Sequence, residues 1–202
     1  MGRLVIFQGP SGSGKSTLGA ATSLSLFPTY TTRTPRPLEI DGRDYHFINK
    51  DHLHKFEVAG GGWVELVEYD GNFYGTTKEQ LSSLDQGETN YWTPLNLEGV
   101  KKYKEFLKTP PLVVGVHVNE FTAYQRLKDR YGNNVEAIAR RMSTYREETS
   151  HLHNTDVVIS TEMPLAFCLK TLRRILAIEL HPDCLAGRAC DGCDILDCVL
   201  RK

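Results

Sequence analysis

Short apolar runs, many of them β-branched, alternate with amphipathic stretches along most of the chain. Each apolar run is bounded by turn residues, a pattern that predicts buried strands. Such strands are expected at Leu4–Gln8, Trp63–Val67, Leu112–Val118 and Asp156–Ser160, with a fifth near Thr89–Thr93. Because helices are expected between them, the pattern predicts an α/β fold with a mostly parallel sheet covered on both faces.

Apolar residues that recur three and four positions apart predict the helices. The clearest is Pro164–Leu180, since proline favours the first helical position and leucines recur along one side. Thr76 and Glu79 have the spacing of a capping box at the start of another helix. The other expected helices are Lys15–Leu26, Thr77–Leu84, Leu97–Lys108 and Val135–Glu148.

Two regions depart from this alternation. Residues 29–62 are turn-rich and polar, which indicates an inserted subdomain. Residues 181–202 begin at His181-Pro182 and contain four of the five cysteines, so they are expected to form an appended tail. No internal repeat is visible.

The composition is that of an ordinary globular protein. The 202 residues are 40% hydrophobic and 24% charged, which excludes disorder or a fibre for most of the chain. With 24 basic and 25 acidic residues there is no overall positive field for nucleic acid, so phosphate recognition must be local. No apolar run has the length of a membrane helix or a signal-peptide core. We therefore expect a cytoplasmic protein without a nucleic-acid or membrane partner; its oligomeric state is left open.

The strongest motif is G-P-S-G-S-G-K-S at residues 9–16, which matches G-x-x-x-x-G-K-[ST] without a mismatch. A predicted strand precedes it and a predicted helix follows. Glycines allow backbone N–H groups to surround a polyphosphate, Lys15 can reach the β- and γ-phosphates, and the Ser16 hydroxyl can bind Mg²⁺. The motif predicts an ATP site formed by Gly9, Pro10, Ser11, Gly12, Ser13, Gly14, Lys15, Ser16 and Thr17.

A second group of residues suits a small dianionic phosphate. Arg33 and Arg36 lie three residues apart beside prolines that stiffen their loop, and Tyr45 and Tyr74 add phenol hydroxyls. Forked guanidinium groups match phosphate oxygens in pairs. These four side chains predict a binding site for a phosphorylated acceptor.

The segments T-T-R-T-P-R at 31–36, D-G-R-D-Y-H-F at 41–47 and G-N-F-Y-G-T at 71–76 resemble the guanylate kinase family in sequence and order. The resemblance runs from Arg3 to about residue 167. It implies a P-loop nucleoside monophosphate kinase that transfers a phosphoryl group from ATP to GMP or dGMP, with Mg²⁺. It also implies a domain at 1–180, with a core of 1–28, 77–122 and 142–180, a nucleotide-binding insert of 29–76 and a helical lid of about 123–141.

The same resemblance assigns roles to individual residues. It implies that Arg33, Arg36, Tyr45 and Tyr74 hold the GMP phosphate. It places Glu65, Thr76 and Thr29 beside the base, and Asn96 at a further substrate position. It makes Lys15 and Arg33 catalytic together with Arg126, Arg130 and Arg141, which match the lid pattern and would close on the phosphates.

The chemistry of guanine agrees with these roles. A carboxylate at Glu65 can accept from guanine N1–H and the 2-amino group, whereas adenine presents a lone pair at N1; such a mismatch discriminates strongly. A Thr76 hydroxyl that donates to O6 would reinforce the choice. The acceptor phosphate is already anionic, so catalysis requires alignment and charge neutralisation rather than a general base.

Two stretches depart from the family pattern. Residues 94–99 read P-L-N-L-E-G where the family has D-x-D-x-x-G, so Asn96 is uncharged and Glu98 is a candidate substitute. Ser160-Thr161 replaces an N-D pair near the expected adenine site. These changes leave two alternatives: a related kinase for a modified purine deoxynucleotide or a phosphorylated sugar, and a non-catalytic phosphopeptide-binding module. Lys15 and Ser16 argue against the latter.

The tail and two histidines carry further metal-ligating side chains. Four tail thiolates would complete a tetrahedral Zn²⁺ site, and the alternative is a tail with free thiols. These residues are Cys184, Cys190, Cys193 and Cys198. His151 and His153 are interpreted as part of a solvated turn.

Overall fold

The computed structural model describes residues 3–53, 62–69, 71–87 and 89–180. The chain divides into two compact units. The first unit is Met1–Ile6 with Leu24–Pro111, and the second unit is Phe7–Ser23 with Leu112–Lys202. The boundary between the two units falls inside strand β1 (Leu4–Gln8).

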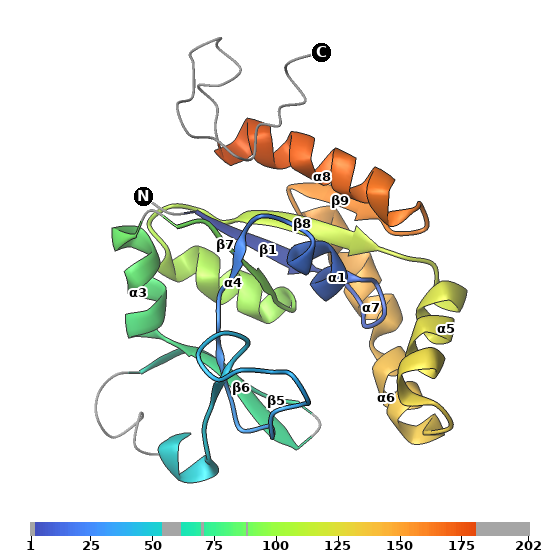
Figure 1. The fold of residues 1–202 in the computed structure, drawn as a ribbon, viewed down its shortest axis with the longest axis horizontal. Helices are drawn as coiled ribbons and strands as arrows, with labels where there is room; N and C mark the ends of the chain where they lie inside the picture. The colour runs from blue at the N-terminus through green and yellow to red at the C-terminus, as the bar shows by residue number, and fades with distance from the viewer. Residues whose placement is uncertain (1–2, 54–61, 70, 88, 181–202) are drawn as a thin grey trace. The chain divides into compact units, whose positions relative to one another are not determined.

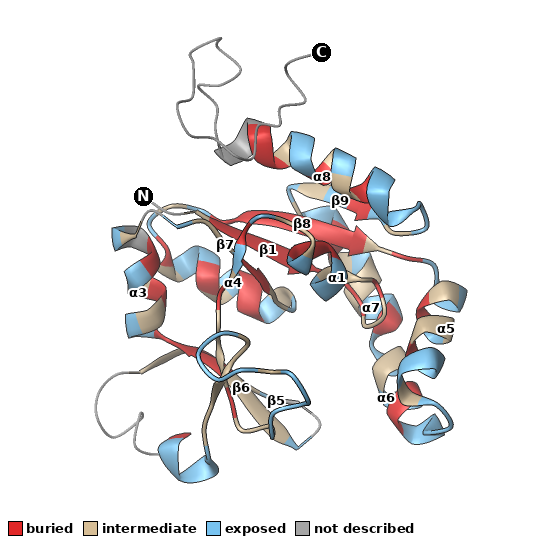
Figure 2. Ribbon diagram, viewed as in Figure 1, coloured by how far each residue is buried: buried red, intermediate tan, exposed pale blue. Residues whose placement is uncertain are grey.

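A five-stranded sheet has the order β2-β7-β1-β8-β9. Strand β2 pairs in parallel with β7, and β8 pairs in parallel with β9. Strand β1 is buried along its whole length (Figure 2), as expected for a central strand. The bounds of the other strands are Ser25–Leu26 for β2, Tyr91–Pro94 for β7, Leu112–His117 for β8 and Val157–Ser160 for β9. The predicted α/β fold with a parallel sheet is confirmed.

A smaller four-stranded sheet lies in the first unit, in the order β4-β3-β6-β5. The strand predicted at Trp63–Val67 belongs here, as β5, so its assignment to the parallel sheet is wrong. Two residues, 70 and 71, join it to β6, and that connection is too short for the crossover that parallel strands need. Figure 1 shows the resulting antiparallel pair. The bounds are Tyr30–Thr31 for β3, His46–Phe47 for β4, Trp63–Tyr69 for β5 and Asn72–Thr77 for β6.

Two predicted helices are shorter than expected. Helix α1 spans Lys15–Ala20 and does not reach residue 26, because Ser25 and Leu26 form strand β2 beside β7, and Phe27 donates a backbone hydrogen bond to Trp92. The stretch Val135–Glu148 is divided at Thr144 into α6 and α7. The bounds of the remaining helices are Leu97–Phe106 for α4, Glu120–Tyr131 for α5, Val135–Ser143 for α6, Tyr145–Ser150 for α7, His151–Asn154 for the 3₁₀ helix η1 and Leu165–Leu180 for α8.

Helix α3 (Lys78–Gln86) begins one residue later than predicted, and this shift matters for the site. Its capping box is formed by Thr77 and Gln80, so the expectation of a box at Thr76 and Glu79 is wrong. Thr76 is the penultimate residue of β6, and its side chain is buried. The hydroxyl of Thr76 is therefore available for another interaction.

Packing within each unit holds the functional segments. In the first unit, α4 packs against β5, and α3 packs against β5 and β6. In the second unit, α8 packs against β9 and α1, and α5 lies beside α6 (Figure 1). Within the residues that the structure describes, no helix is long and apolar enough to cross a membrane.

Candidate functional site

The glycine-rich loop follows β1 and turns sharply under helix α1, in the second unit. Gly9 has a φ of +151°, and a Cβ there would lie 2.3 Å from the carbonyl oxygen of Val116. Gly12 has a φ of +80°, and a Cβ there would lie 2.8 Å from the carbonyl oxygen of Ala123. Glycine is therefore required at both positions for the loop to close against the neighbouring backbone.

Lys15 reaches across this loop. Its Nζ donates to the carbonyl oxygens of Gly9, at 2.5 Å, and Pro10, at 2.9 Å. Burial lowers the pKa of Lys15 to about 8; Glu148 opposes this shift, and Arg141 and Arg130 add to it. Lys15 is therefore still mostly cationic at neutral pH, and it is held inside the loop that would surround a polyphosphate.

Arg126 of α5 is attached to the same loop. Its guanidinium donates to the Thr161 hydroxyl at 2.9 Å, the Thr161 carbonyl at 2.8 Å and the Gly12 carbonyl at 3.2 Å. The Thr161 hydroxyl in turn donates to the Ser13 carbonyl at 2.7 Å. The position at which the sequence departs from the family pattern thus contacts both the loop and a predicted lid arginine.

Arg130 and Arg141 both lie close to the ring of Tyr131. Their guanidinium carbons lie 5.7 Å and 5.8 Å from the centroid of its ring. Both arginines are close enough to lower the pKa of Lys15. Four cationic side chains, Lys15 and the three predicted lid arginines, therefore gather in the second unit, which favours an anionic ligand there.

A cavity of about 230 Å³ lies beside the loop within the second unit. Its walls are formed in part by a glycine of the loop, by helix α1 and by the start of α8. Its lining residues are Gly14, Thr17, Leu18, Arg126, Thr161, Met163, Leu165 and Cys168. The walls are mostly apolar and include one arginine and two threonines. Such a cavity suits the flat base of a nucleotide whose phosphates bind in the loop.

The residues of the loop also fit a phosphate-bound Mg²⁺. Mg²⁺ keeps water and phosphate oxygens as most of its ligands, so one hydroxyl such as that of exposed Ser16 is enough from the protein. Among the described residues, no three His, Cys, Asp or Glu side chains are grouped so as to hold a metal by themselves. Ser13 Oγ is buried without a hydrogen-bond partner in the described structure, and a bound polyphosphate can supply one.

The first unit brings together the predicted phosphate-binding side chains. The Arg33 guanidinium lies over Tyr45, at 5.4 Å, and the rings of Tyr45 and Tyr74 are 6.1 Å apart. Arg33 is also paired with both carboxylate oxygens of Glu39, at 2.8 and 2.9 Å, and the backbone N–H of Arg36 donates to the same carboxylate at 2.7 Å. Sequence reasoning missed Glu39, although an acid three residues after Arg36 was the available signal. Arg36 itself is exposed.

Glu65 and Thr76 are direct partners across β5 and β6, where a register shift follows Trp63. Directly paired residues project from the same face of a sheet, so the carboxylate and the hydroxyl are neighbours. Glu65 is 5% exposed and Thr76 is fully buried. Burial raises the pKa of Glu65 to about 7, and Lys102 opposes this shift. The structure thus brings together the two side chains predicted to face the base.

Helix α4 supplies two residues that sequence reasoning did not select. The Tyr103 hydroxyl lies 2.5 Å from Thr76 Oγ1, and both atoms are buried. A Cβ at Gly99 would lie 2.8 Å from Glu65 Oε1. In the sequence, Gly99 stood out only as the glycine that ends the 94–99 motif. No sequence motif pointed to Tyr103.

The other predicted substrate residues have local partners. Asn96 caps α4, since its Oδ1 accepts from the N–H of Gly99 at 2.9 Å. Glu98, the candidate substitute for a family aspartate, is exposed and paired with Lys101 at 2.8 Å. The carbonyl of Thr29, a half-buried residue, accepts from the N–H of His46. Their substrate contacts remain predictions.

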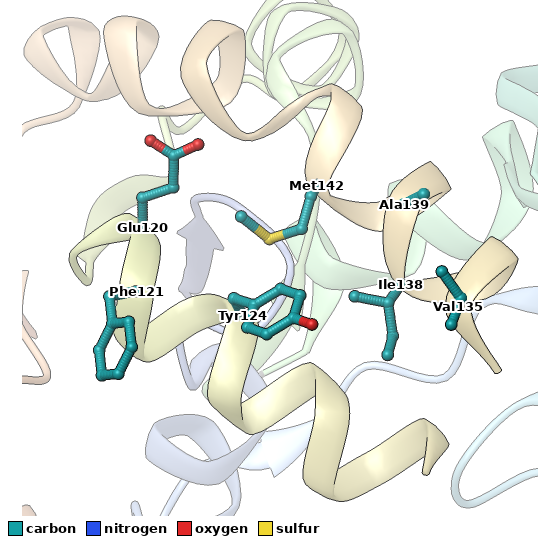
Figure 3. Close-up of a pocket in the computed structure, with 7 residues that line it drawn as sticks. All are labelled: Glu120, Phe121, Tyr124, Val135, Ile138, Ala139 and Met142. Carbon is teal, nitrogen blue, oxygen red and sulfur yellow. The ribbon is translucent and has the colours of Figure 1, made fainter. Parts of the chain in front are cut away.

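Helices α5 and α6 form an apolar groove of about 590 Å³. Figure 3 shows Tyr124 and Met142 pointing toward each other across it. Its lining residues are Glu120, Phe121, Tyr124, Val135, Ile138, Ala139 and Met142, and none is a predicted site residue.

The remaining sequence predictions concern two histidines, the cysteine-rich tail and the boundaries of the insert and the lid. His151 and His153 lie in η1, where His153 is exposed. The four tail cysteines, considered as a Zn²⁺ site or as free thiols, lie outside the described residues. The predicted insert and lid boundaries remain predictions.

Comparison with known proteins agrees with these local features. The model of the family described as guanylate kinase matches residues 1–178. The guanylate kinase of Nitrosospira multiformis is 32% identical over 88% of this chain and 86% of its own length. That of Aliivibrio fischeri is 34% identical over 78% and 79%. A crystal structure of guanylate kinase from Anaplasma phagocytophilum, at 22% identity, covers 89% of this chain and 87% of its own with a TM-score of 0.66, a likeness of fold. The chain belongs to the guanylate kinase family.

Proposed function

We propose that this protein transfers the γ-phosphoryl group of ATP to GMP or dGMP, forming ADP and GDP or dGDP. The observation that carries the choice of base is the buried Glu65 carboxylate beside the Thr76 hydroxyl. The curated relatives are named guanylate kinases, which supports the same substrate. The substrates are small soluble nucleotides, so we place the activity in the cytoplasm with no nucleic-acid or membrane partner.

ATP binds at the glycine-rich loop of the second unit. Lys15 leaves the carbonyls of Gly9 and Pro10 and neutralises the β- and γ-phosphates. Arg126, Arg130 and Arg141 add positive charge and exclude water as the lid closes. The cavity beside Thr161 and Cys168 receives the adenine ring. The Ser16 hydroxyl would hold the Mg²⁺ that accompanies ATP, and the metal would supply further charge neutralisation.

The monophosphate binds in the first unit. Its phosphate replaces the Glu39 carboxylate as the partner of Arg33, and Arg36, Tyr45 and Tyr74 complete the contacts. Glu65 in its ionised form accepts from N1–H and the 2-amino group, and Thr76 donates to O6. The acceptor oxygen is already anionic, so these residues act by alignment and no side chain has to remove a proton.

The function is tested by an ATP-coupled assay with a panel of monophosphates. The panel contains GMP, dGMP, AMP, dAMP, IMP, pyrimidine nucleotides and a modified purine deoxynucleotide. GMP or dGMP should give the highest kcat/KM. Faster turnover of the modified purine would favour the related kinase, and ATP binding without turnover of any member would favour the non-catalytic module.

Arg36→Ala should weaken use of the monophosphate while leaving ATP largely unaffected. Its exposed guanidinium is expected to bind the GMP phosphate through charge-assisted hydrogen bonds, so KM for GMP should rise by about 10- to 100-fold. Initial rates at varied GMP and varied ATP measure both constants.

Arg43→Ala is the matched control, because Arg43 is an exposed arginine of the same segment that already pairs with Asp44 at 2.8 Å. It should leave both KM values near those of the wild type. An unchanged KM for GMP, or an equal rise of the two KM values, in Arg36→Ala would contradict a specific role of Arg36 in binding the monophosphate.

A further inference from the structure

We propose that Tyr103 is a positioning residue for base selection, because its hydroxyl makes Thr76 a hydrogen-bond donor toward the 6-position of the purine. The inference rests on the proposed function and adds to it the residue that sets the direction of one base contact. It concerns the first unit alone.

The two hydroxyls form an isolated buried pair. Tyr103 Oη and Thr76 Oγ1 are 2.5 Å apart, and each residue is fully buried. Neither hydroxyl has another hydrogen bond within the part of the chain that the structure describes. Together they carry two protons, and the bond between them uses one. The second proton therefore needs an acceptor from outside the pair.

The identity of the purine decides whether that acceptor is present. A 6-oxo group accepts the second proton, so every donor of the pair is satisfied when Tyr103 donates to Thr76 and Thr76 donates to the base. A 6-amino group brings further donors instead and leaves one hydroxyl proton buried without a partner. A buried unsatisfied donor costs much more than a normal hydrogen bond contributes. The pair thus disfavours a 6-amino purine, because one hydroxyl proton would have no acceptor.

The surroundings keep Tyr103 protonated. Burial raises its pKa; the hydrogen bond with Thr76 opposes this shift, and the negative charge of Glu65 adds to it. The Glu65 carboxylate that is expected to bind one edge of guanine therefore also keeps the proton on the residue that orients the other contact. Tyr103 remains a donor throughout the neutral range.

Helix α4 positions both contacts from one face. Gly99 and Tyr103 are four residues apart, so they lie on the same side of the helix, which packs against β5. The absence of a side chain at Gly99 leaves room for the Glu65 carboxylate, and Tyr103 reaches Thr76 one turn later. One helix therefore supports the two predicted base-reading side chains.

Tyr103→Phe, assayed with GMP, 6-thio-GMP and IMP, tests this role. The 6-thio analogue changes only the 6-position and presents a weaker acceptor, whereas IMP lacks only the 2-amino group that Glu65 reads. Thr76 keeps its proton in the variant but is no longer held as a donor, so the kcat/KM ratio of GMP to 6-thio-GMP should fall by about fivefold, within the effect of one hydrogen bond. The ratio of GMP to IMP should stay at the wild-type value.

Two further variants keep the test decisive. Tyr145→Phe removes a buried tyrosine hydroxyl that donates to the Val118 carbonyl in the second unit, so it controls for lost stability and should change neither ratio. Thr76→Val combined with Tyr103→Phe removes both hydroxyls at nearly constant shape and should fold even if the single variant does not. Its GMP to 6-thio-GMP ratio should be lowered at least as far as that of Tyr103→Phe, because the donor itself is also lost.

The outcomes separate the inference from the function on which it rests. Equal losses of kcat/KM with all three nucleotides, or an unchanged 6-position ratio in Tyr103→Phe, would reduce Tyr103 to a packing residue and leave the guanylate kinase function intact. A wild-type protein that turns over no guanine nucleotide would overturn both.

Discussion

Lys15→Ala should remove nearly all phosphoryl transfer. Lys15 is the side chain that spans the glycine-rich loop, and it is expected to stabilise charge on the transferred group as the transition state forms. Loss of such a group typically costs about 10³-fold or more in kcat. The effect should appear in kcat with both GMP and dGMP, measured at saturating ATP.

Lys128→Ala provides the control, because Lys128 is an exposed lysine on α5. It should retain wild-type kcat. A Lys15→Ala protein that keeps more than a tenth of the wild-type kcat would contradict the placement of ATP at this loop.

Lys15 also has a measurable effect on stability. Its pKa is about 8 in the folded protein, below the ordinary value of 10.5, so the unfolded chain binds more protons between these values. The folded state should therefore gain stability as pH rises from about 8 to 10.5. Denaturant unfolding of Lys15→Ala should show a smaller increase in the free energy of unfolding over this pH range. Such a result would show that the buried Lys15 ammonium group causes the pH dependence.

Glu65→Gln should relax the choice of base. The amide can donate to adenine N1, and it loses the paired acceptors that guanine N1–H and the 2-amino group require. The kcat/KM preference for GMP over AMP should fall by about 10²-fold or more. Glu68→Gln is the matched control, since Glu68 lies on the same strand and is exposed. An unchanged preference in Glu65→Gln would place base recognition elsewhere.

The same substitution should remove a pH dependence. The Glu65 pKa is about 7, and only the ionised carboxylate accepts both hydrogen bonds, so kcat/KM for GMP should rise with pH up to about 7 and then level off. The glutamine variant should lack this inflection. A raised carboxyl pKa also means that wild-type stability falls as pH rises from 4.5 to about 7. Glu65→Gln should therefore melt at a higher temperature than the wild type at pH 8.

Features set by local spacing were predicted well. The strand Leu4–Gln8 and the loop after it were identified to the residue, because the motif specifies strand, turn and helix within a short stretch. Helix α8 starts one residue after the predicted Pro164 for the same kind of reason. The pairing of Arg33 with Tyr45 and Tyr74 followed from motifs whose order the family resemblance supplied.

Features set by long-range pairing were not predictable from local pattern. Trp63–Val67 has the composition of a parallel strand. It belongs to the smaller sheet because the chain turns back after it and forms β6, which pairs with it in the antiparallel direction. Thr76 and Thr77 are both residue types that can cap a helix. Thr77 caps α3, whereas Thr76 contacts Tyr103 of α4, and this contact between distant segments cannot be read from the local sequence. Thr161 was noted only as a departure from the family pattern. Its contacts with Arg126 and Ser13 were not predicted, because they join segments far apart in the chain.

The most direct measurement is the product analysis of ATP mixed with GMP or with AMP, at equal concentrations and with Mg²⁺, resolved by ³¹P NMR. ADP and GDP should form in equal amounts from GMP, with little ADP from AMP. Consumption of ATP without GDP, or equal conversion of AMP, would contradict guanine selection by Glu65 and Thr76.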